Sequence, residues 1–106
     1  DRPLRGDWHR FAPGVLPSDF FKRNCFMSLQ EDAVGIRVRD VLGAETLMWG
    51  SDYPHTESTF PRSREITARV LADVPAEEQR MILRDNVAAP YGFDLPALTR
   101  AAENTP

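Results

Sequence analysis

The side chains best suited to chemistry lie in one short stretch, residues 47–55. An apolar run, Leu-Met-Trp, leads through Gly and Ser to the carboxylate of Asp52, and a proline then precedes His55. Because a short apolar run between polar segments is typical of a strand buried on both faces, we predict a parallel β-strand over residues 46–51. Asp52 would then stand at the C-terminal end of that strand, which is where parallel α/β sheets place their reactive groups.

Asp52 has two interpretations that the residues alone leave open. A carboxylate directly after a strand can cap a turn or the next helix. It can also bind a divalent ion through one oxygen and accept a proton from metal-bound water through the other. His55 is either a loop histidine bonded to backbone or to Glu57, or a pocket-wall side chain that orients Asp52 or a substrate. Tyr53 either lines the same mouth or covers it.

Four other side chains have an ordinary explanation beside a functional one. His9 is the only other histidine, and it lies in a proline-rich opening segment where we expect a loop or surface residue. Cys25 lies in the apolar run 24–29 and is expected to be a small hydrophobe of the core. Arg23 and Arg62 flank the two predicted strand–loop junctions, where each can meet a carboxylate substrate or form a surface salt bridge.

The elements expected around Asp52 form a strand–helix–strand unit. The first strand is predicted over residues 24–29 and the second over 46–51. A helix over 34–42 lies between them, with Asp32 as its N-cap and Gly43 as its stop. Its expected buried stripe is Val34, Val38, Val41 and Leu42. Such a unit has parallel strands and a right-handed crossover.

Alternation along the second strand assigns its side chains to two faces. If Asp52 points into the mouth, Met48 and Gly50 share its face, and Gly50 leaves room beneath a metal. Leu47 and Trp49 then face the surrounding helices. The buried indole N–H of Trp49 would need a hydrogen-bond partner.

The remaining segments are predicted to be irregular at the start of the chain and helical at its end. The predicted pieces are an irregular segment 1–18, a short turn 18–23 capped by Ser18, a loop 53–62, a helix 64–71 capped by Ser63, a helix 76–83, a turn 87–89 that Asn86 caps and Pro90 ends, and a helix 95–103.

Composition excludes several classes of partner. The chain has 106 residues, enough for one small domain, and its thirteen basic and sixteen acidic residues give a net charge of −3. That balance gives no basic footprint for nucleic acid or an anionic membrane. No apolar run approaches the roughly 20 residues of a membrane span. A single cysteine is typical of a reducing compartment, so we expect a cytoplasmic protein.

The segment WGSDYPH, together with ESTFPRS and DNVAAPYGF further on, resembles the C-terminal end of amidohydrolase-related proteins. This family (amidohydrolase 2) is grouped with the aminocarboxymuconate-semialdehyde decarboxylase-like metal enzymes. The similarity extends from about Pro17 to Phe93. It implies an α/β fold that is the C-terminal portion of a (β/α)8 TIM barrel, with strands seven and eight and the closing helices. It also implies that Asp52 ends strand eight, binds a divalent metal, for which zinc is our choice, and transfers protons.

The resemblance also implies that residues 1–106 are a partial segment of a barrel domain. Complete barrels of this kind need about 250 residues. A catalytic metal site takes about three protein ligands, and the family's others come from earlier strands that nothing here matches. We therefore expect this segment alone to be inactive. Pro90 departs from the family pattern, in which a helix-compatible residue follows the N-x-A segment.

Three functional hypotheses follow. The leading one is a metal-dependent hydrolase in which activated water attacks an amide, ester or lactone of a small-molecule substrate. A metal-dependent decarboxylase of the same superfamily is the first alternative. The second is a non-catalytic α/β interaction module in which Asp52 and His55 are structural caps. The expected protein partners are a second copy of the chain or the missing N-terminal part of the barrel.

Overall fold

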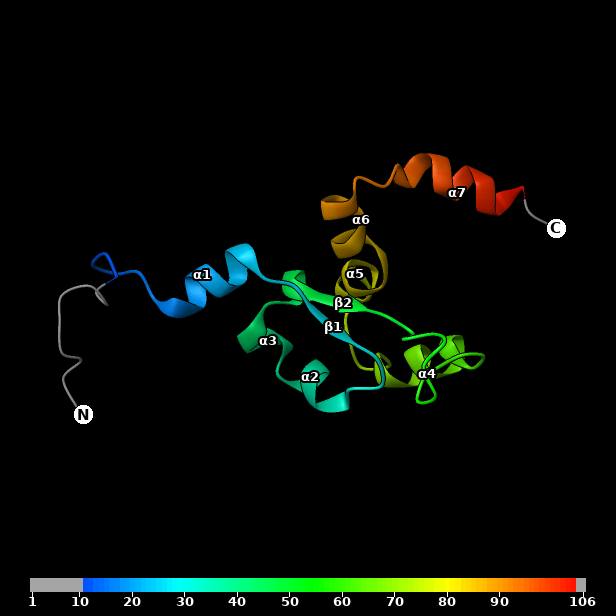
Figure 1. Ribbon diagram of the computed structural model, residues 1–106, viewed down its shortest axis with the longest axis horizontal. Coiled ribbons are helices and arrows are strands. Elements are labelled where there is room, and N and C mark those ends of the chain that lie inside the picture. The colour runs from blue at the N-terminus through cyan, green and yellow to red at the C-terminus, as the bar shows by residue number, and fades with distance from the viewer. Residues whose placement is uncertain (1–10, 105–106) are drawn as a thin grey trace.

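The computed structural model describes residues 11–104, and its centre is a strand–helix–strand unit (Figure 1). Strand β1 (Met27–Leu29) and strand β2 (Leu47–Trp49) pair in parallel, with Met27 opposite Leu47 and Leu29 opposite Trp49. The elements between them are α2 (Ala33–Arg37), α3 (Arg39–Leu42) and the 3-10 turn η2 (Ala44–Thr46). The predicted parallel unit is therefore confirmed.

Both strands are shorter than the sequence predicted. The register that sets Met27 opposite Leu47 would place residues 24–26 opposite η2. A 3-10 turn offers no ladder of outward-facing amide and carbonyl groups, so those residues have nothing to pair with. At the other end, pairing continues for one residue beyond the strands, because Gly50 N–H donates to Leu29 O at 3.0 Å.

The crossover begins and ends where the sequence predicted, but it is not one helix. The carboxylate of Asp32 accepts from Gly35 N–H at 2.8 Å and caps α2, and Gly43 ends α3 with a φ of +94°. Between the two helices Val38 leaves helical geometry, with φ −99° and ψ 11°. Because of this break, the apolar side chains of α2 and α3 no longer lie along one continuous face.

The valines expected to be buried in this crossover are therefore exposed, which corrects the prediction. Val34 is 70% exposed and Val41 is 74% exposed, whereas Ile36, in the short helix α2, is only 5% exposed. A 3.6-residue period buries one continuous face only while the helix is continuous.

The C-terminal part is helical, as predicted, although its boundaries differ. It contains α4 (Ser63–Val70), α5 (Ala76–Arg80), the π-helical turn η3 (Met81–Asp85), α6 (Asn86–Tyr91) and α7 (Leu95–Glu103). Pro90 lies inside α6 and does not end it; Gly92 ends it in the left-handed conformation with a φ of +67°. Because Pro90 is next to last, its missing N–H costs only the final turn of the helix.

Two predicted caps are also corrected. Helix α1 (Pro17–Asn24) begins before Ser18, and its first turn is closed by Asp19, whose carboxylate accepts from Leu16 N–H at 2.8 Å. Ser63 is the first residue of α4 and not its cap, and its hydroxyl lies 2.9 Å from the hydroxyl of Thr59.

The hydrophobic core lies on one face of the two-stranded sheet. It is formed by Leu29 and Leu47 from the strands together with Ile36 of α2, Leu71 and Val74 of the connection between α4 and α5, and Ile82 of η3. Trp49 packs against this cluster, as predicted. Burying each such Leu or Ile contributes about 1.5–3 kcal/mol, so this cluster is the main attachment of the helices to the strands.

The opposite face of the sheet has small or half-exposed side chains. Ser28 is exposed, and Met48 and Gly50 are half-buried, which confirms the predicted alternation along β2. A Cβ added at Gly50 would lie 3.3 Å from Ser28 Oγ, so the glycine keeps this face shallow. On the core side, the indole Nε1 of Trp49 is buried and has no hydrogen-bond partner among residues 11–104.

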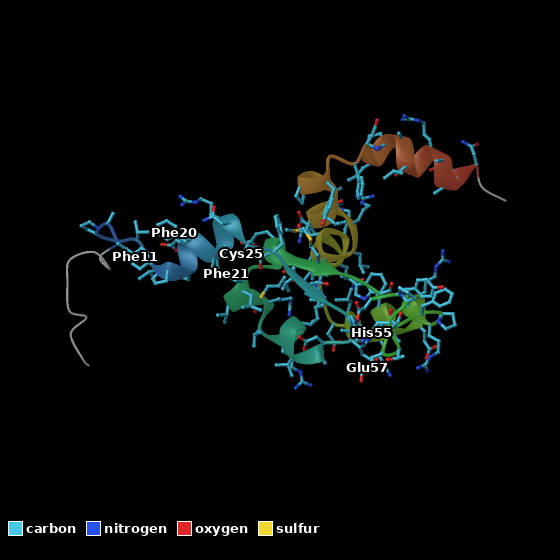
Figure 2. All side chains as sticks on the ribbon, in the orientation of Figure 1. Phe11, Phe20, Phe21, Cys25, His55 and Glu57 are labelled. Atoms are coloured by element: carbon cyan, nitrogen blue, oxygen red, sulfur yellow. The ribbon has the colours of Figure 1, made fainter. Side chains whose placement is uncertain are left out.

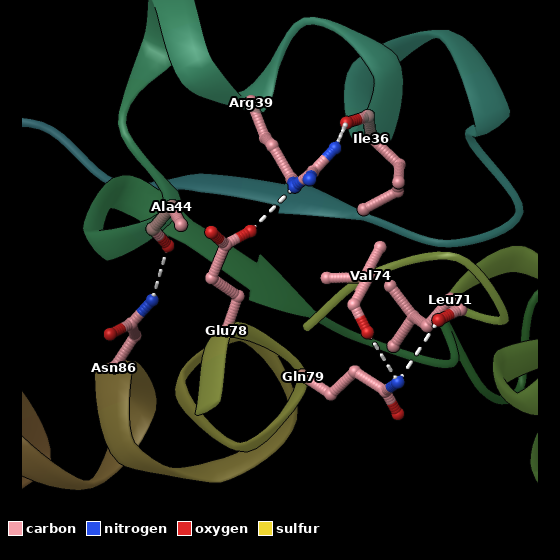
Figure 3. A network of polar contacts seen from close by, with 8 residues as sticks. All are labelled: Ile36, Arg39, Ala44, Leu71, Val74, Glu78, Gln79 and Asn86. Atoms are coloured by element: carbon pink, nitrogen blue, oxygen red, sulfur yellow. Dashed lines mark hydrogen bonds and ion pairs between the residues drawn. The ribbon is translucent and has the colours of Figure 1, made fainter. Parts of the chain in front are cut away.

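Two side-chain amides hold the C-terminal part in place: one attaches it to the strand unit and the other acts within the helical part itself (Figure 3). The side-chain nitrogen of Asn86 donates to Ala44 O and Leu47 O, each at 2.8 Å, at the start of β2. Asn86 is thus a buried clamp and not the predicted helix cap. The side-chain nitrogen of Gln79 donates to Leu71 O at 3.1 Å and Val74 O at 2.8 Å and closes the connection between α4 and α5.

An ion pair adds a link between α3 and α5. Arg39 Nε lies 2.5 Å from Glu78 Oε2, while its Nη1 donates to Ile36 O at 3.2 Å (Figure 3). The hydrogen bond to Glu78 raises the pKa of Arg39 above its ordinary value. This guanidinium joins elements 39 residues apart in sequence on the helical side of the sheet.

Helices α1 and α7 stand away from this central body at opposite ends of the molecule (Figure 1). Neither contains a buried residue. The radius of gyration is 17.8 Å, against about 13 Å for a compact domain of this length. Cys25, between α1 and β1, is exposed, which corrects its predicted place in the core. It precedes the paired part of β1, so no neighbouring strand or helix covers it.

Candidate active site

Asp52 lies three residues beyond the last residue of β2, on the C-terminal side of the parallel strands. Its backbone is left-handed, with a φ of +57°, and among residues 11–104 it is the one non-glycine residue with a positive φ. Aspartate tolerates this region better than most residues, but it costs free energy unless the surroundings hold it. The surroundings here are a short, internally bonded loop.

The loop 51–59 is closed by backbone hydrogen bonds. Thr59 N–H donates to Ser51 O at 3.0 Å, His55 N–H to Asp52 O at 2.8 Å, and Ser58 N–H to His55 O at 3.1 Å. Thr59 is 4% exposed and its hydroxyl bonds to the first residue of α4. The loop is therefore fixed at one end to β2 and at the other to α4.

The first of these turns brings Asp52 and His55 together. His55 Nδ1 lies 3.6 Å from Asp52 Oδ2, and both side chains are more than half exposed, at 58% and 57%. The same Nδ1 accepts a hydrogen bond from Glu57 N–H at 3.3 Å. Figure 2 shows His55 and Glu57 on the loop beside α4. Both contacts considered for His55 from the sequence, the loop at Glu57 and the carboxylate of Asp52, are thus close to its ring.

The carboxylate of Asp52 caps nothing in this loop. The turn is closed by its backbone carbonyl, and no N–H or O–H of residues 11–104 donates to its side-chain oxygens. A capping carboxylate would accept such bonds, as Asp32 and Asp94 do at the starts of α2 and α7. The side chain of Asp52 is therefore available to a ligand.

Tyr53 and Phe60 form an aromatic pair across the ends of the loop. Their ring centroids are 4.9 Å apart with an interplanar angle of 60°, and both rings are mostly exposed. Tyr53 N–H also donates to Ser51 Oγ at 3.3 Å. The sequence indicated Tyr53 as a site residue but not its partner Phe60, because the pairing of the two rings depends on loop closure and not on spacing along the chain.

The other side chains considered from the sequence are not brought to this loop. Arg23 lies on α1, where its guanidinium stacks over the ring of Phe20 at 4.9 Å. Arg62 occupies the N-cap position of α4 without a side-chain capping bond. His9 lies outside the residues that the structure describes.

These residues can supply part of a metal site. Within residues 11–104, no group of three or more His, Cys, Asp or Glu side chains is arranged to hold a metal ion. Asp52 fits as a single oxygen ligand, because its carboxylate is exposed and accepts no hydrogen bond. Since a catalytic ion takes about three protein ligands, the other two would have to come from outside this segment.

Comparison with protein-family models gives a match. A family model described as Amidohydrolase matches residues 18–93, from the first turn of α1 to the residue after Gly92. The search of curated proteins returned no match. Within the described part of the chain, no helix has the length and apolar character needed to cross a membrane.

Proposed function

Because this chain belongs to the amidohydrolase family, we propose that it forms the C-terminal part of a metal-dependent hydrolase. In this proposal β1 and β2 are strands seven and eight of a (β/α)8 barrel, and α2 with α3 is the helical layer between them. The small-molecule substrate binds at the C-terminal ends of the strands, beside Asp52.

The observation that supports this assignment most directly is the unbonded carboxylate of Asp52 in a left-handed backbone. A non-glycine residue held at a positive φ is costly, and such residues cluster at functional sites. The N–H groups of this loop donate to main-chain carbonyls or to the side chains of Ser51, His55 and Ser58, and none of them donates to the Asp52 side chain. That arrangement favours a ligand over a structural cap.

The sheet itself supports the existence of further strands. Within residues 11–104 it has two strands, so each has an outer edge that no other described strand pairs with, and such edges readily pair with more strands. In the same part of the chain, the core cluster lies on the other face of the sheet and not on the face formed by Ser28, Met48 and Gly50. In a barrel this face is the interior and the helix-covered face is the exterior.

Asp52 has two tasks in the proposed site. One carboxylate oxygen is a ligand for a divalent ion, with zinc as our choice, and the other accepts a proton during the reaction. A bound ion of this kind supplies Lewis acidity and lowers the pKa of water toward neutrality. His55 and Tyr53 form the wall of the substrate pocket next to the carboxylate.

Metal analysis of the full-length protein tests this proposal. Asp52→Asn keeps the size of the side chain and tolerates a positive φ, but it removes the anionic ligand. We expect its affinity for zinc to fall at least tenfold, measured by competition with a chelator and by metal content after dialysis. Glu57→Gln, a loss of one carboxylate in the same loop, is the matched control and should bind zinc as the parent does.

Equal metal content in Asp52→Asn and the parent would remove Asp52 from the coordination shell and overturn the proposal. Products then separate the two reaction types. Cleavage of a chromogenic aryl ester or amide that requires Asp52 indicates a hydrolase, and Asp52-dependent release of CO₂ from an aryl carboxylate indicates the decarboxylase alternative.

A further inference from the structure

The ring nitrogens of His55 have different surroundings. Nδ1 faces the backbone N–H of Glu57 at 3.3 Å. A backbone amide nitrogen donates and never accepts, so Nδ1 must present its lone pair. A neutral imidazole that accepts at Nδ1 has its proton on Nε2. The main chain of the loop therefore selects the Nε2–H tautomer.

The opposite tautomer is poorly served by the same loop. A proton on Nδ1 would point at the N–H of Glu57, two donors facing each other. Its nearest acceptor would be Asp52 Oδ2 at 3.6 Å, beyond normal hydrogen-bond distance. The bonds from His55 N–H to Asp52 O and from Ser58 N–H to His55 O fix residue 57 relative to the ring. The tautomer is thus set by the loop and not by the carboxylate.

Nε2–H remains for a ligand. No acceptor among residues 11–104 bonds to it, and the side chain of His55 is 58% exposed beside Asp52. Nδ1 already accepts a hydrogen bond from the main chain, so the ring nitrogen left to face a ligand is Nε2, which bears the proton in this tautomer. What the ring offers at the rim of the site is a hydrogen-bond donor.

We propose that His55 is a substrate-binding residue that donates from Nε2–H to an acceptor oxygen of the substrate, a carbonyl or carboxylate oxygen, next to Asp52. This assignment rests on the proposed function for the existence of a substrate at this rim. It narrows the substrate to molecules that bring an oxygen acceptor to His55, and it excludes those that bring an ammonium group there.

Two variants separate the binding role of the ring from its role in the loop. In His55→Asn the side-chain oxygen can replace Nδ1 as the acceptor for Glu57 N–H, but no donor reaches the position of Nε2. In His55→Gln the longer amide can place an N–H near that position. The ring's part in loop structure predicts that Asn is the better replacement, and the binding role predicts that Gln is.

The experiment is a titration of the zinc-loaded, ¹⁵N-labelled full-length protein with acetate as the acceptor probe and methylammonium as the donor probe. We expect the ¹⁵N spectrum of His55 to show a bare Nδ1 and a protonated Nε2. Acetate should shift Nε2–H saturably, and methylammonium should not. His55→Asn should weaken acetate binding about tenfold, the loss expected for one hydrogen bond, and His55→Gln should retain most of it.

A proton on Nδ1, or acetate binding unchanged in His55→Asn, overturns the assignment. Its failure is distinguishable from failure of the metal site. If Asp52→Asn keeps its zinc while His55 shows the expected tautomer and acetate response, the metal assignment is wrong and the donor role stands. If Asp52→Asn loses its zinc while Nδ1 of His55 is protonated, the metal assignment stands and the donor role is wrong.

Discussion

At Asp52 the main chain and the side chain affect the folding free energy in different ways. The carboxylate makes no hydrogen bond with residues 11–104, so removing it should cost little folding free energy. The φ of +57° is another matter, because it penalises any residue with a Cβ unless the loop compensates. The change in folding stability caused by a substitution at residue 52 should therefore depend more on the backbone conformation than on the lost carboxylate.

We predict that Asp52→Gly is more stable than Asp52→Ala by about 1 kcal/mol. Both variants lack the carboxylate, and only glycine adopts a φ of +57° without strain. The measurement is the midpoint of urea unfolding for the two variants, read with an unchanged slope. Equal midpoints, or a higher one for alanine, would show that residue 52 is not left-handed in solution.

At the same scale, the sequence predicted the pair Asp52 and His55 but not the geometry that relates them. Three-residue spacing across a proline indicated a turn. The left-handed φ and the bond from Glu57 N–H to Nδ1 depend on closure of the loop between Ser51 and Thr59, which no local pattern records. Asn86 was predicted as a helix cap, and its role as a clamp was missed for the same reason, since its acceptors Ala44 O and Leu47 O lie 42 and 39 residues away in sequence.

At the scale of elements, the order strand, helix, strand and helical tail followed from the sequence. Parallel pairing of β1 and β2, the cap at Asp32 and the stop at Gly43 were all confirmed. The exposure of Val34 was not foreseen, because an apolar period predicts a buried face only if the helix is continuous and something covers it. Local signals such as the cap at Asp32 and the stop at Gly43 mark where the crossover begins and ends, whereas tertiary contacts set the lengths of the strands and decide which face is buried.

The π-helical turn η3 ends in the carboxylate of Asp85, which two arginines hold. Arg84 Nε lies 2.7 Å from one oxygen of Asp85, and Arg80 Nε lies 3.0 Å from the other. The hydrogen bond from Arg84, followed by that from Arg80, holds the pKa of Asp85 below its ordinary value. Since the unfolded chain then binds the proton more tightly than the folded one, this contribution to stability is complete above the ordinary aspartate pKa, about 3.9, and is lost as pH falls through the lowered folded value.

We therefore expect Asp85→Asn to destabilise the protein at pH 7 and to converge with the parent in strong acid. The free energy of unfolding of both proteins is measured from pH 7 to pH 2, and 1 M NaCl should shrink the difference at pH 7, because the pair is partly exposed. Asp73→Asn, a carboxylate in the α4–α5 connection without such partners, is the control. A difference that persists unchanged at pH 2 would show that the arginines do not stabilise ionised Asp85.

At the scale of the whole molecule, many large apolar side chains of residues 11–104 are exposed. The helices α1 and α7 bury nothing, and Phe26, Val34 and Val41 are between 51% and 74% exposed. Single exposed hydrophobes are ordinary, but contiguous ones with open strand edges mark surfaces that other chains cover. The family match supports one identity for the cover, the preceding strands and helices of the same barrel.

This distinction gives the last prediction. Residues 1–106 alone should self-associate, with a mass in size-exclusion light scattering above the 12.0 kDa of one chain and rising with concentration. In the proposed barrel, preceding strands of a longer protein would cover the outer edges of β1 and β2, so the measured mass of that protein should not depend on its concentration. Binding of the dye 8-anilinonaphthalene sulfonate should be weaker in the longer protein than in residues 1–106 alone, since the dye binds exposed apolar surface.

Trp49 provides an internal probe, because its buried indole N–H has no partner among residues 11–104 and should gain one only when the rest of the proposed barrel is present. If residues 1–106 form a 12.0 kDa monomer that unfolds in one cooperative step, the result would instead support a small independent module. In that module the carboxylate of Asp52 is a surface group and not a ligand of a metal site that other residues complete.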